Sequence, residues 1–208
     1  VGSGVYNVIS RNLAAINARA NCEIKIAQIG CRRDNPDCAL SATPVTRDIF
    51  EVAKNPDINV VVELIGGTTT AYKLVMTALE NGKHVVTANK ALIAEHGMEI
   101  FSEAESRGLM VCYEAAVAGG IPIIKSLREG LSANRVNWLA GIINGTTNFI
   151  LSEMDTTGRN FNDVLIEAQE KGYAEADPTF DVEGIDASHK LAILASIAKL
   201  IAYMKNFV

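Results

Sequence analysis

The feature that most constrains the fold is a regular alternation, between residues 22 and 117, of short apolar runs with segments of helical periodicity. One run, NVVVELIGG at 59–67, is almost continuously apolar, which is typical of a strand buried on both faces of a parallel sheet. Strands and helices that alternate in this way predict a doubly wound α/β fold. The predicted strands are 22–30, 59–67, 83–89 and 109–117, and the predicted helices are 4–20, 46–56, 70–82 and 90–108.

The pattern changes after about residue 116. The later sequence predicts an α+β domain with its own smaller sheet over 117–208, following a first domain over 1–116. Its expected elements are a helix at 119–131, a strand at 135–144, and helices at 146–157, 161–171 and 185–203. Trp138 and the apolar residues around it are expected in the core of this domain.

Composition limits the possible partners and the compartment. The net charge of −5 comes without a basic cluster, which argues against nucleic acid and against an anionic membrane surface. The longest apolar stretch, LAILASIAKLIAY, is interrupted by Lys199 and is shorter than the roughly 20 residues of a membrane span. The sequence shows no signal peptide. Because Cys22, Cys31, Cys38 and Cys112 form no CxxC pair, we expect reduced cysteines in a cytoplasmic protein, with neither a zinc site nor disulfides.

Two short motifs favour binding of a dinucleotide cofactor. VGSGV at 1–5, which contains Gly2, leads a glycine turn into a helix, where free backbone N–H groups can hold a phosphate; an ordinary glycine turn explains these residues equally well. IGCRRD places Arg32 and Arg33 after a predicted strand. These arginines are either partners of the 2′-phosphate of NADP or solvated surface residues.

Two further loops follow predicted strands at the carboxyl edge, where open α/β sheets bind ligands. ELIGGTTT ends a strand in Gly66 and Gly67 and continues into Thr68, a candidate ligand contact and a candidate helix N-cap. VTANKALI places Lys90 after the next strand, as a contact to a cofactor or a substrate. The sequence therefore predicts a site for a cofactor or a substrate at this edge.

In YEAAVAGGIPII the acidic residue Glu114 is followed mainly by alanines and glycines, whose small side chains leave the backbone little covered. Glu114 and carbonyls of this segment can surround a hard monovalent cation, because such ions take oxygen ligands. The alternative is a glycine hinge between the two domains.

The stretch YAEADPTFDVEGIDASHK at 173–190 sets five carboxylates ahead of Lys190. If a helix begins near Ile185, Asp186 and Lys190 stand at i and i+4 and project from one face. On an exposed helix this is a routine ion pair, whereas in a cleft the carboxylate orients an ammonium for proton transfer. Glu175 is then placed to bind a substrate ammonium, while Asp177 and Glu183 are expected to be solvated.

Six blocks, in this order, resemble homoserine dehydrogenase: ELIGG, VVTANKALIAEHG, EAAVAGGIPII, GIINGTTNFIL, AQEKGYAEADP and DVEGIDASHKLAIL. For GIINGTTNFIL, a tight turn with a threonine N-cap explains the residues equally well. The resemblance runs from Val1 to about Ala198 and implies a Rossmann-like first domain followed by a domain for substrate binding and dimerisation. It implies the reversible interconversion of L-homoserine and L-aspartate 4-semialdehyde with NAD or NADP, in the biosynthesis of threonine, methionine and isoleucine. A homodimer or higher homo-oligomer is expected.

The resemblance also implies roles for particular residues. Lys190 matches the proton donor and acceptor, Glu175 the ligand of the substrate α-ammonium, and Asp186 and Asp181 acids of the substrate pocket. The positions that match cofactor contacts are Gly2, Gly66, Lys90 and Gly172. A sodium or potassium site is implied at Glu114 and the backbone carbonyls of Val117, Gly119 and Ile121.

Compared with that family, the sequence lacks the first strand and the leading G-x-G of the nucleotide loop, and it ends in AKLIAYMKNFV before the rest of the substrate domain. One hypothesis is therefore an impaired fragment that keeps only the fold or dimerisation. Another is a related NAD(P)-dependent oxidoreductase whose substrate lacks an ammonium and does not need Glu175.

Overall fold

The computed structural model describes residues 1–33 and 43–198. The chain divides into two compact units, Val1–Tyr113 and Glu114–Val208. Cys38 and the last residues of the helix predicted at 185–203 lie outside the described ranges. Cys22, Cys31 and Cys112 are free thiols. No helix in the described part of the chain is long and apolar enough to cross a membrane.

The first unit contains two small parallel sheets. β1 (Ile29–Gly30) pairs with β2 (Val45–Thr46), and β3 (Val60–Glu63), β4 (His84–Thr87) and β5 (Val111–Cys112) pair in that order. Every pair is parallel, so the predicted α/β class is confirmed. The predicted strands are longer than those observed, and β2 was not predicted.

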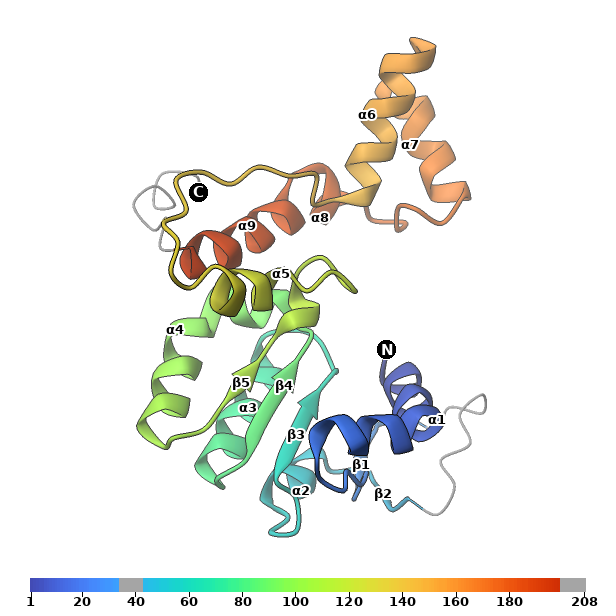
Figure 1. Cartoon of the computed structure of the whole chain (residues 1–208). Helices are drawn as coiled ribbons and strands as arrows, with labels where there is room; N and C mark the ends of the chain where they lie inside the picture. The colour runs from blue at the N-terminus through green and yellow to red at the C-terminus, as the bar shows by residue number, and fades with distance from the viewer. Residues whose placement is uncertain (34–42, 199–208) are drawn as a thin grey trace. The chain divides into compact units, whose positions relative to one another are not determined.

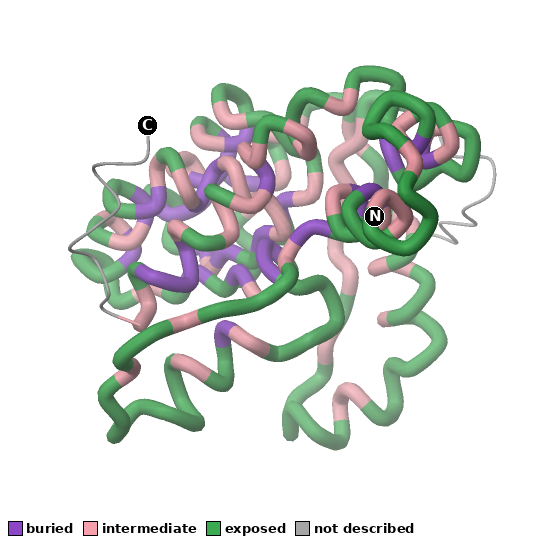
Figure 2. The backbone as a smooth tube through the Cα atoms, turned by 90° about the horizontal axis from the view of Figure 1, so that it is seen from above, coloured by how far each residue is buried: buried purple, intermediate pink, exposed green. Residues whose placement is uncertain are grey.

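Four helices belong to this unit: α1 (Gly2–Ala20), α2 (Ile49–Lys54), α3 (Thr69–Glu80) and α4 (Lys90–Ser106). Helices α3 and α4 pack against the three-stranded sheet (Figure 1). The core of the unit contains Val61, Leu74, Val75, Leu79, Val85, Leu92, Ile100 and Val111. Each such side chain stabilises the unit by roughly 1.5–3 kcal/mol when fully buried. Helix α1 has no buried residue, and its tube starts at the N label of Figure 2.

The prediction that 59–67 forms a strand buried on both faces is wrong. Along β3, buried and exposed residues alternate, with Val61 buried at 3% exposure and Val60 and Val62 exposed at 46% and 45%. Val86 on β4 lies on the same open face at 37% exposure. The reason is that α3 and α4 cover one face, and the described residues do not bury the other.

The second unit is helical in its described part. It contains the 3₁₀ turn η1 (Glu114–Ala116), α5 (Ile123–Lys125), the π-helical turn η2 (Ser126–Gly130), α6 (Gly145–Thr157), α7 (Phe161–Glu170), α8 (Thr179–Val182) and α9 (Ile185–Ile197). Helices α6 and α7 form a hairpin around Ile150, Val164, Ala168 and Ala174. Gly158 ends α6 in the left-handed conformation, and the Asn160 side chain caps α7 by accepting from the Asp163 N–H. These two residues set the tight connection between the helices.

The strand predicted at 135–144 does not form, and Trp138 is not in a core. Residues 135–144 have no regular secondary structure, and Trp138 and Ile142 are 77% and 80% exposed. A strand needs a neighbour for its backbone hydrogen bonds. The described residues of this unit provide no second strand, so the apolar pattern of this segment has no sheet to join.

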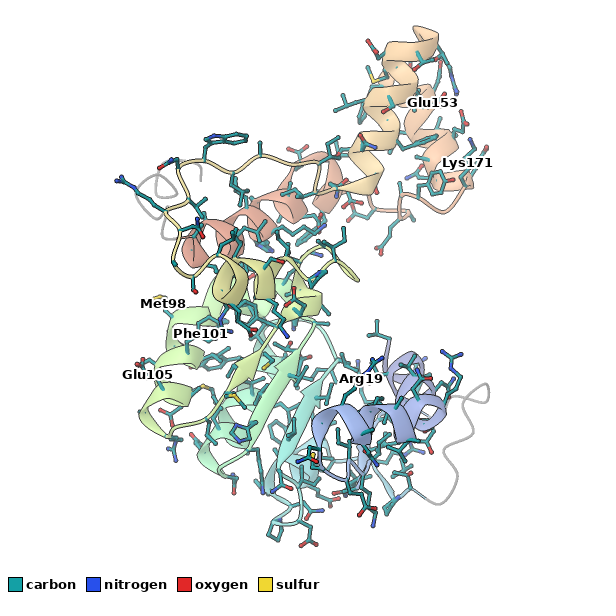
Figure 3. All side chains as sticks on the ribbon, in the orientation of Figure 1. Arg19, Met98, Phe101, Glu105, Glu153 and Lys171 are labelled. Carbon is teal, nitrogen blue, oxygen red and sulfur yellow. The ribbon has the colours of Figure 1, made fainter. Side chains whose placement is uncertain are left out.

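Acid should weaken the α6–α7 hairpin through one carboxylate. Lys171 donates to Glu167 at 2.6 Å and Arg159 also pairs with it, and these hydrogen bonds, that of Lys171 first, lower the pKa of Glu167 (Figure 3 labels Lys171). Because the folded-state pKa lies below the unfolded one, the stabilisation is present above the usual pKa of about 4.3 and is lost as pH falls through the folded-state value. Urea unfolding followed by circular dichroism should therefore show a smaller loss of stability on acidification in Glu167→Gln than in the wild type.

The matched control is Glu170→Gln, on the exposed side of the same helix. It should keep the pH dependence of the wild type. Equal slopes for the wild type and Glu167→Gln between about pH 5 and pH 2 would contradict the assignment.

Candidate functional site

The carboxyl edge of the first unit carries a turn of two glycines. Gly66 and Gly67 follow β3 with φ angles of 74° and 70°, a conformation that residues with a Cβ rarely adopt. A Cβ built at either position would meet no atom within 4 Å, so the glycines serve the backbone conformation and leave open space beside it. The turn leads into α3, where Thr68 holds the N-cap position but makes no side-chain cap bond. The capping expected of Thr68 is therefore absent.

Lys90 lies at the same edge, shortly after the end of β4. Glu63 and Thr87, the last residues of β3 and β4, are register partners, so the loops that follow them start side by side. Asn89 caps α4 by accepting from the Leu92 N–H at 3.1 Å, and Lys90 is the first residue of that helix. Lys90 is thus held at the carboxyl edge, as the sequence predicted.

Arginines follow the two strands of the smaller sheet. Arg32 and Arg33 follow β1 after Cys31 and are exposed. Arg47 follows β2 and donates to the Cys31 carbonyl at 3.1 Å. Arg47 was not predicted from the sequence, because its proximity to the end of β1 depends on the parallel pairing of β1 with β2. Gly2 lies in the first turn of α1, which has no acidic residue that would oppose an anion there.

A compact polar cluster in the second unit contains Asp181, Asp186 and Lys190. Helix α8 lies between the start of α6 and α9 (Figure 1), so residues distant in sequence meet here. Lys190 Nζ donates to Asp186 Oδ2 at 2.6 Å and to the Ile143 carbonyl at 2.6 Å. The side chains of Asp186 and Lys190 are only 6% and 19% exposed. The alternative of a routine exposed ion pair is therefore excluded.

Asn144 joins the two aspartates of this cluster. Its Nδ2 donates to Asp181 Oδ1 at 2.8 Å and to Asp186 Oδ2 at 2.9 Å. Thr146 Oγ1 donates its single proton to Asp181 Oδ2 at 2.9 Å or to the Tyr173 carbonyl at 2.7 Å. Two carboxylates and one ammonium are thus held together by neutral donors, an arrangement that carries net negative charge next to a proton donor.

Glu175 and Gly172 lie in the loop between α7 and α8. Both are exposed, and Gly172 has a φ of 72° just after α7. Within the described residues no hydrogen bond of the Glu175 carboxylate is found, and its backbone carbonyl accepts from Gln169 at 3.1 Å. Asp177 was expected to be only solvated, but it also accepts two hydrogen bonds. These come from the Thr179 hydroxyl at 2.6 Å and from the Thr179 N–H at 3.1 Å, and they lower the pKa of Asp177.

The proposed cation ligands share one loop. Glu114 accepts with both carboxylate oxygens, from the Ile124 N–H at 2.8 Å and the Lys125 N–H at 2.9 Å. Val117 is buried, Gly119 and Ile121 are exposed, and Ala118 and Gly119 have φ angles of 59° and 56°. In the described ranges no three His, Cys, Asp or Glu side chains gather as a metal site. One carboxylate with backbone carbonyls is an oxygen donor set that suits a hard cation.

Family models match both units. Residues 1–114 match the NAD binding domain of homoserine dehydrogenase, and residues 122–206 match the homoserine dehydrogenase model itself. This chain belongs to the homoserine dehydrogenase family.

Known homoserine dehydrogenases are similar to this chain over most of its length. The homoserine dehydrogenase of Pseudomonas aeruginosa is 69% identical over 198 residues, which cover 95% of this chain and 46% of that protein. The crystal structure of a homoserine dehydrogenase from Thiobacillus denitrificans is 59% identical with a TM-score of 0.89, over 95% of this chain and 46% of that one. A hyperthermophilic archaeal homoserine dehydrogenase solved in complex with NADPH is 32% identical with a TM-score of 0.68, over 73% of this chain and 47% of that one. The chain thus spans about half the length of the homoserine dehydrogenases it matches.

The residue that sequence reasoning missed in the second unit is Asn144. It stands before a helix in the block GIINGTTNFIL, where the sequence indicated a threonine N-cap. The observed N-cap is Asn144, which accepts from the Thr147 N–H at 2.8 Å. An Asn in that block of the homoserine dehydrogenase pattern was the available signal, because an amide can cap with its oxygen while its nitrogen donates elsewhere.

Proposed function

We propose that this chain carries the homoserine dehydrogenase reaction, the reversible NAD(P)-dependent interconversion of L-homoserine and L-aspartate 4-semialdehyde. The observation that carries the proposal is the placement of Lys190 Nζ, held by Asp186 Oδ2 and the Ile143 carbonyl next to Asn144 and Asp181. Because the described residues give Lys190 Nζ two acceptors, its ammonium keeps a third proton for a substrate oxygen.

In the reducing direction NAD(P)H, when bound, supplies the hydride to the aldehyde carbon. The Lys190 ammonium donates a proton to the aldehyde oxygen, so that the aldehyde becomes the alcohol and Lys190 becomes a neutral amine. In the oxidising direction the neutral amine accepts the hydroxyl proton. Asp186 orients Lys190 in both directions through its hydrogen bond to Nζ.

We assign substrate binding to two acidic residues of the second unit. Glu175, exposed in the loop after α7, is the proposed partner of the α-ammonium, with Asp181 as a further acid of the pocket. If the substrate carries no ammonium, Glu175→Gln should leave its KM unchanged. A rise in KM of about tenfold, from loss of a charged hydrogen bond, supports homoserine over a neutral substrate.

The cofactor positions proposed in the first unit are Gly2, Arg32, Arg33, Gly66, Thr68 and Lys90, with Gly172 from the second unit. Arg32 and Arg33 favour NADP, since a 2′-phosphate needs a cationic partner. The proposed cation, sodium or potassium, would be held by Glu114 and the carbonyls of Val117, Gly119 and Ile121, where it would support the loop structurally. We place the protein in the cytoplasm as a homodimer or higher homo-oligomer, within the biosynthesis of threonine, methionine and isoleucine.

The deciding experiment is a fluorescence titration of this chain with NADPH and NADH, with and without homoserine. Saturable binding that homoserine strengthens supports the proposal and justifies kinetics. A folded chain that binds neither nucleotide contradicts it and favours a chain that keeps only the fold or dimerisation, which a measurement of mass in solution would detect.

A further inference from the structure

Glu63 is a fully buried carboxylate that none of the proposed roles uses. It is the last residue of β3, and its exposure is 0%. A buried charge is costly unless hydrogen bonds compensate it, so a glutamate at this position needs a reason.

The reason lies in its three hydrogen bonds. Glu63 Oε1 accepts from the backbone N–H groups of Ile65 at 2.8 Å and Gly66 at 3.1 Å. Glu63 Oε2 accepts from the Thr87 hydroxyl at 2.5 Å. One side chain thus fixes the glycine turn after β3 and the end of β4.

These bonds continue into a closed ring. Thr87 Oγ1 accepts from the Asn89 N–H at 3.0 Å, and Asn89 Nδ2 donates to the Gly67 carbonyl at 2.7 Å. The ring therefore returns to the glycine turn through the residue that caps α4. The turn and the first residue of α4, Lys90, cannot move independently while these bonds hold.

The direction of the bonds also matters. The N–H groups of Ile65 and Gly66 point toward the buried carboxylate, and no atom lies within 4 Å of the place where a Cβ of Gly66 or Gly67 would stand. The carboxylate thus holds the amides at the start of the turn, while Gly66 and Gly67 keep the left-handed conformation and remain exposed to a ligand. An apolar residue in place of Glu63 could be buried at lower cost, but it would leave both amides without an acceptor.

We propose that Glu63 is a positioning residue of the nucleotide site: it holds the Gly66–Gly67 turn and, through Thr87 and Asn89, the start of α4 in the conformation that binds NAD(P). The inference rests on the proposed cofactor function. Because Glu63 is fully buried, we assign it no direct contact with the cofactor.

The test uses Glu63→Ala, Glu63→Gln and Thr87→Val in this chain, with NADPH fluorescence titration and amide hydrogen exchange. Glu63→Ala should weaken NADPH binding at least about tenfold, since it removes an acceptor of three hydrogen bonds. Glu63→Gln keeps one oxygen for the turn amides and should recover most of that loss. Thr87→Val is close in shape to the native residue and should weaken binding by several-fold, with faster exchange of the Asn89 amide.

Two controls separate positioning from stability. Val85→Ala creates a cavity on β4 away from the turn and should lower the unfolding temperature while leaving the NADPH dissociation constant of the folded chain unchanged. Glu105→Gln, on the exposed surface of α4 (Figure 3), should change neither quantity.

The proposal is overturned if Glu63→Ala and Thr87→Val bind NADPH like the wild type below their unfolding temperatures, or if Glu63→Ala leaves the exchange of the Ile65 and Gly66 amides unchanged. A wild-type chain that does not bind NADPH refutes the proposed cofactor function. Faster exchange in Glu63→Ala would then show that the hydrogen-bonded ring exists but serves no cofactor, which also overturns the positioning role.

Discussion

Replacing Lys190 with arginine is expected to lower kcat by about 10²- to 10⁴-fold while NADPH binding stays within a few-fold of the wild type. Arginine keeps the positive charge and can still donate to Asp186 Oδ2 and the Ile143 carbonyl. A guanidinium is not deprotonated in proteins, so it cannot give up and recover a proton as an amine does. Steady-state kinetics in both directions, together with the nucleotide titration, measure the effect.

The control for Lys190→Arg is Lys125→Arg, since the side chain of Lys125 is 67% exposed and, among the described residues, forms only a surface ion pair with Glu129. It should leave kcat unchanged. A Lys190→Arg enzyme with near wild-type kcat would remove Lys190 from proton transfer and leave it a structural ion pair. Parallel losses of kcat and nucleotide binding would instead indicate a general distortion of the chain.

Changing Asn144 to aspartate is expected to reduce the free energy of unfolding by about 3 kcal/mol at neutral pH. The Asn144 amide donates to Asp181 and to Asp186, so the substitution removes two donors and sets a third carboxylate against two others. Asn144 and Asp186 are only 8% and 4% exposed, so water cannot replace the lost bonds. Because protonation would relieve the repulsion, the loss of stability should shrink as pH falls toward about 4. Urea unfolding over this pH range is the measurement.

Asn160→Asp is the matched control, because Asn160 also caps a helix with its side chain but is exposed. Asn160→Asp also removes a donor to a carboxylate, Asp163 Oδ2 at 2.7 Å, but both side chains are exposed and water can replace that bond. Aspartate caps as well as asparagine does, so this variant should lose under about 1 kcal/mol. If Asn144→Asp behaved like Asn160→Asp, the bridge between the two aspartates would be unimportant. A loss of stability that does not depend on pH would also contradict the charge repulsion described here.

Features that depend on local order could be predicted from the amino-acid sequence alone. Apolar runs alternating with amphipathic segments are enough to predict parallel strands and helices α1, α3 and α4, and parallel strands bring their carboxyl ends to one edge. The order of residues in the chain therefore places Gly66, Gly67 and Lys90 at one edge of the sheet. The spacing of Asp186 and Lys190 likewise predicted their contact, since residues four apart share a helix face.

Features that depend on distant segments required the folded arrangement. Periodicity shows which side chains are apolar but not whether another element covers them. Val60, Val62 and Trp138 were therefore predicted to be buried, although they are exposed. The bridge from Asn144 to Asp181 and Asp186 joins residues 37 and 42 positions apart, and the ring through Glu63 joins two strands 24 positions apart. Such pairings cannot be predicted from the local sequence. They form only when packing brings buried donors and acceptors together and excludes the water that would otherwise form hydrogen bonds with them.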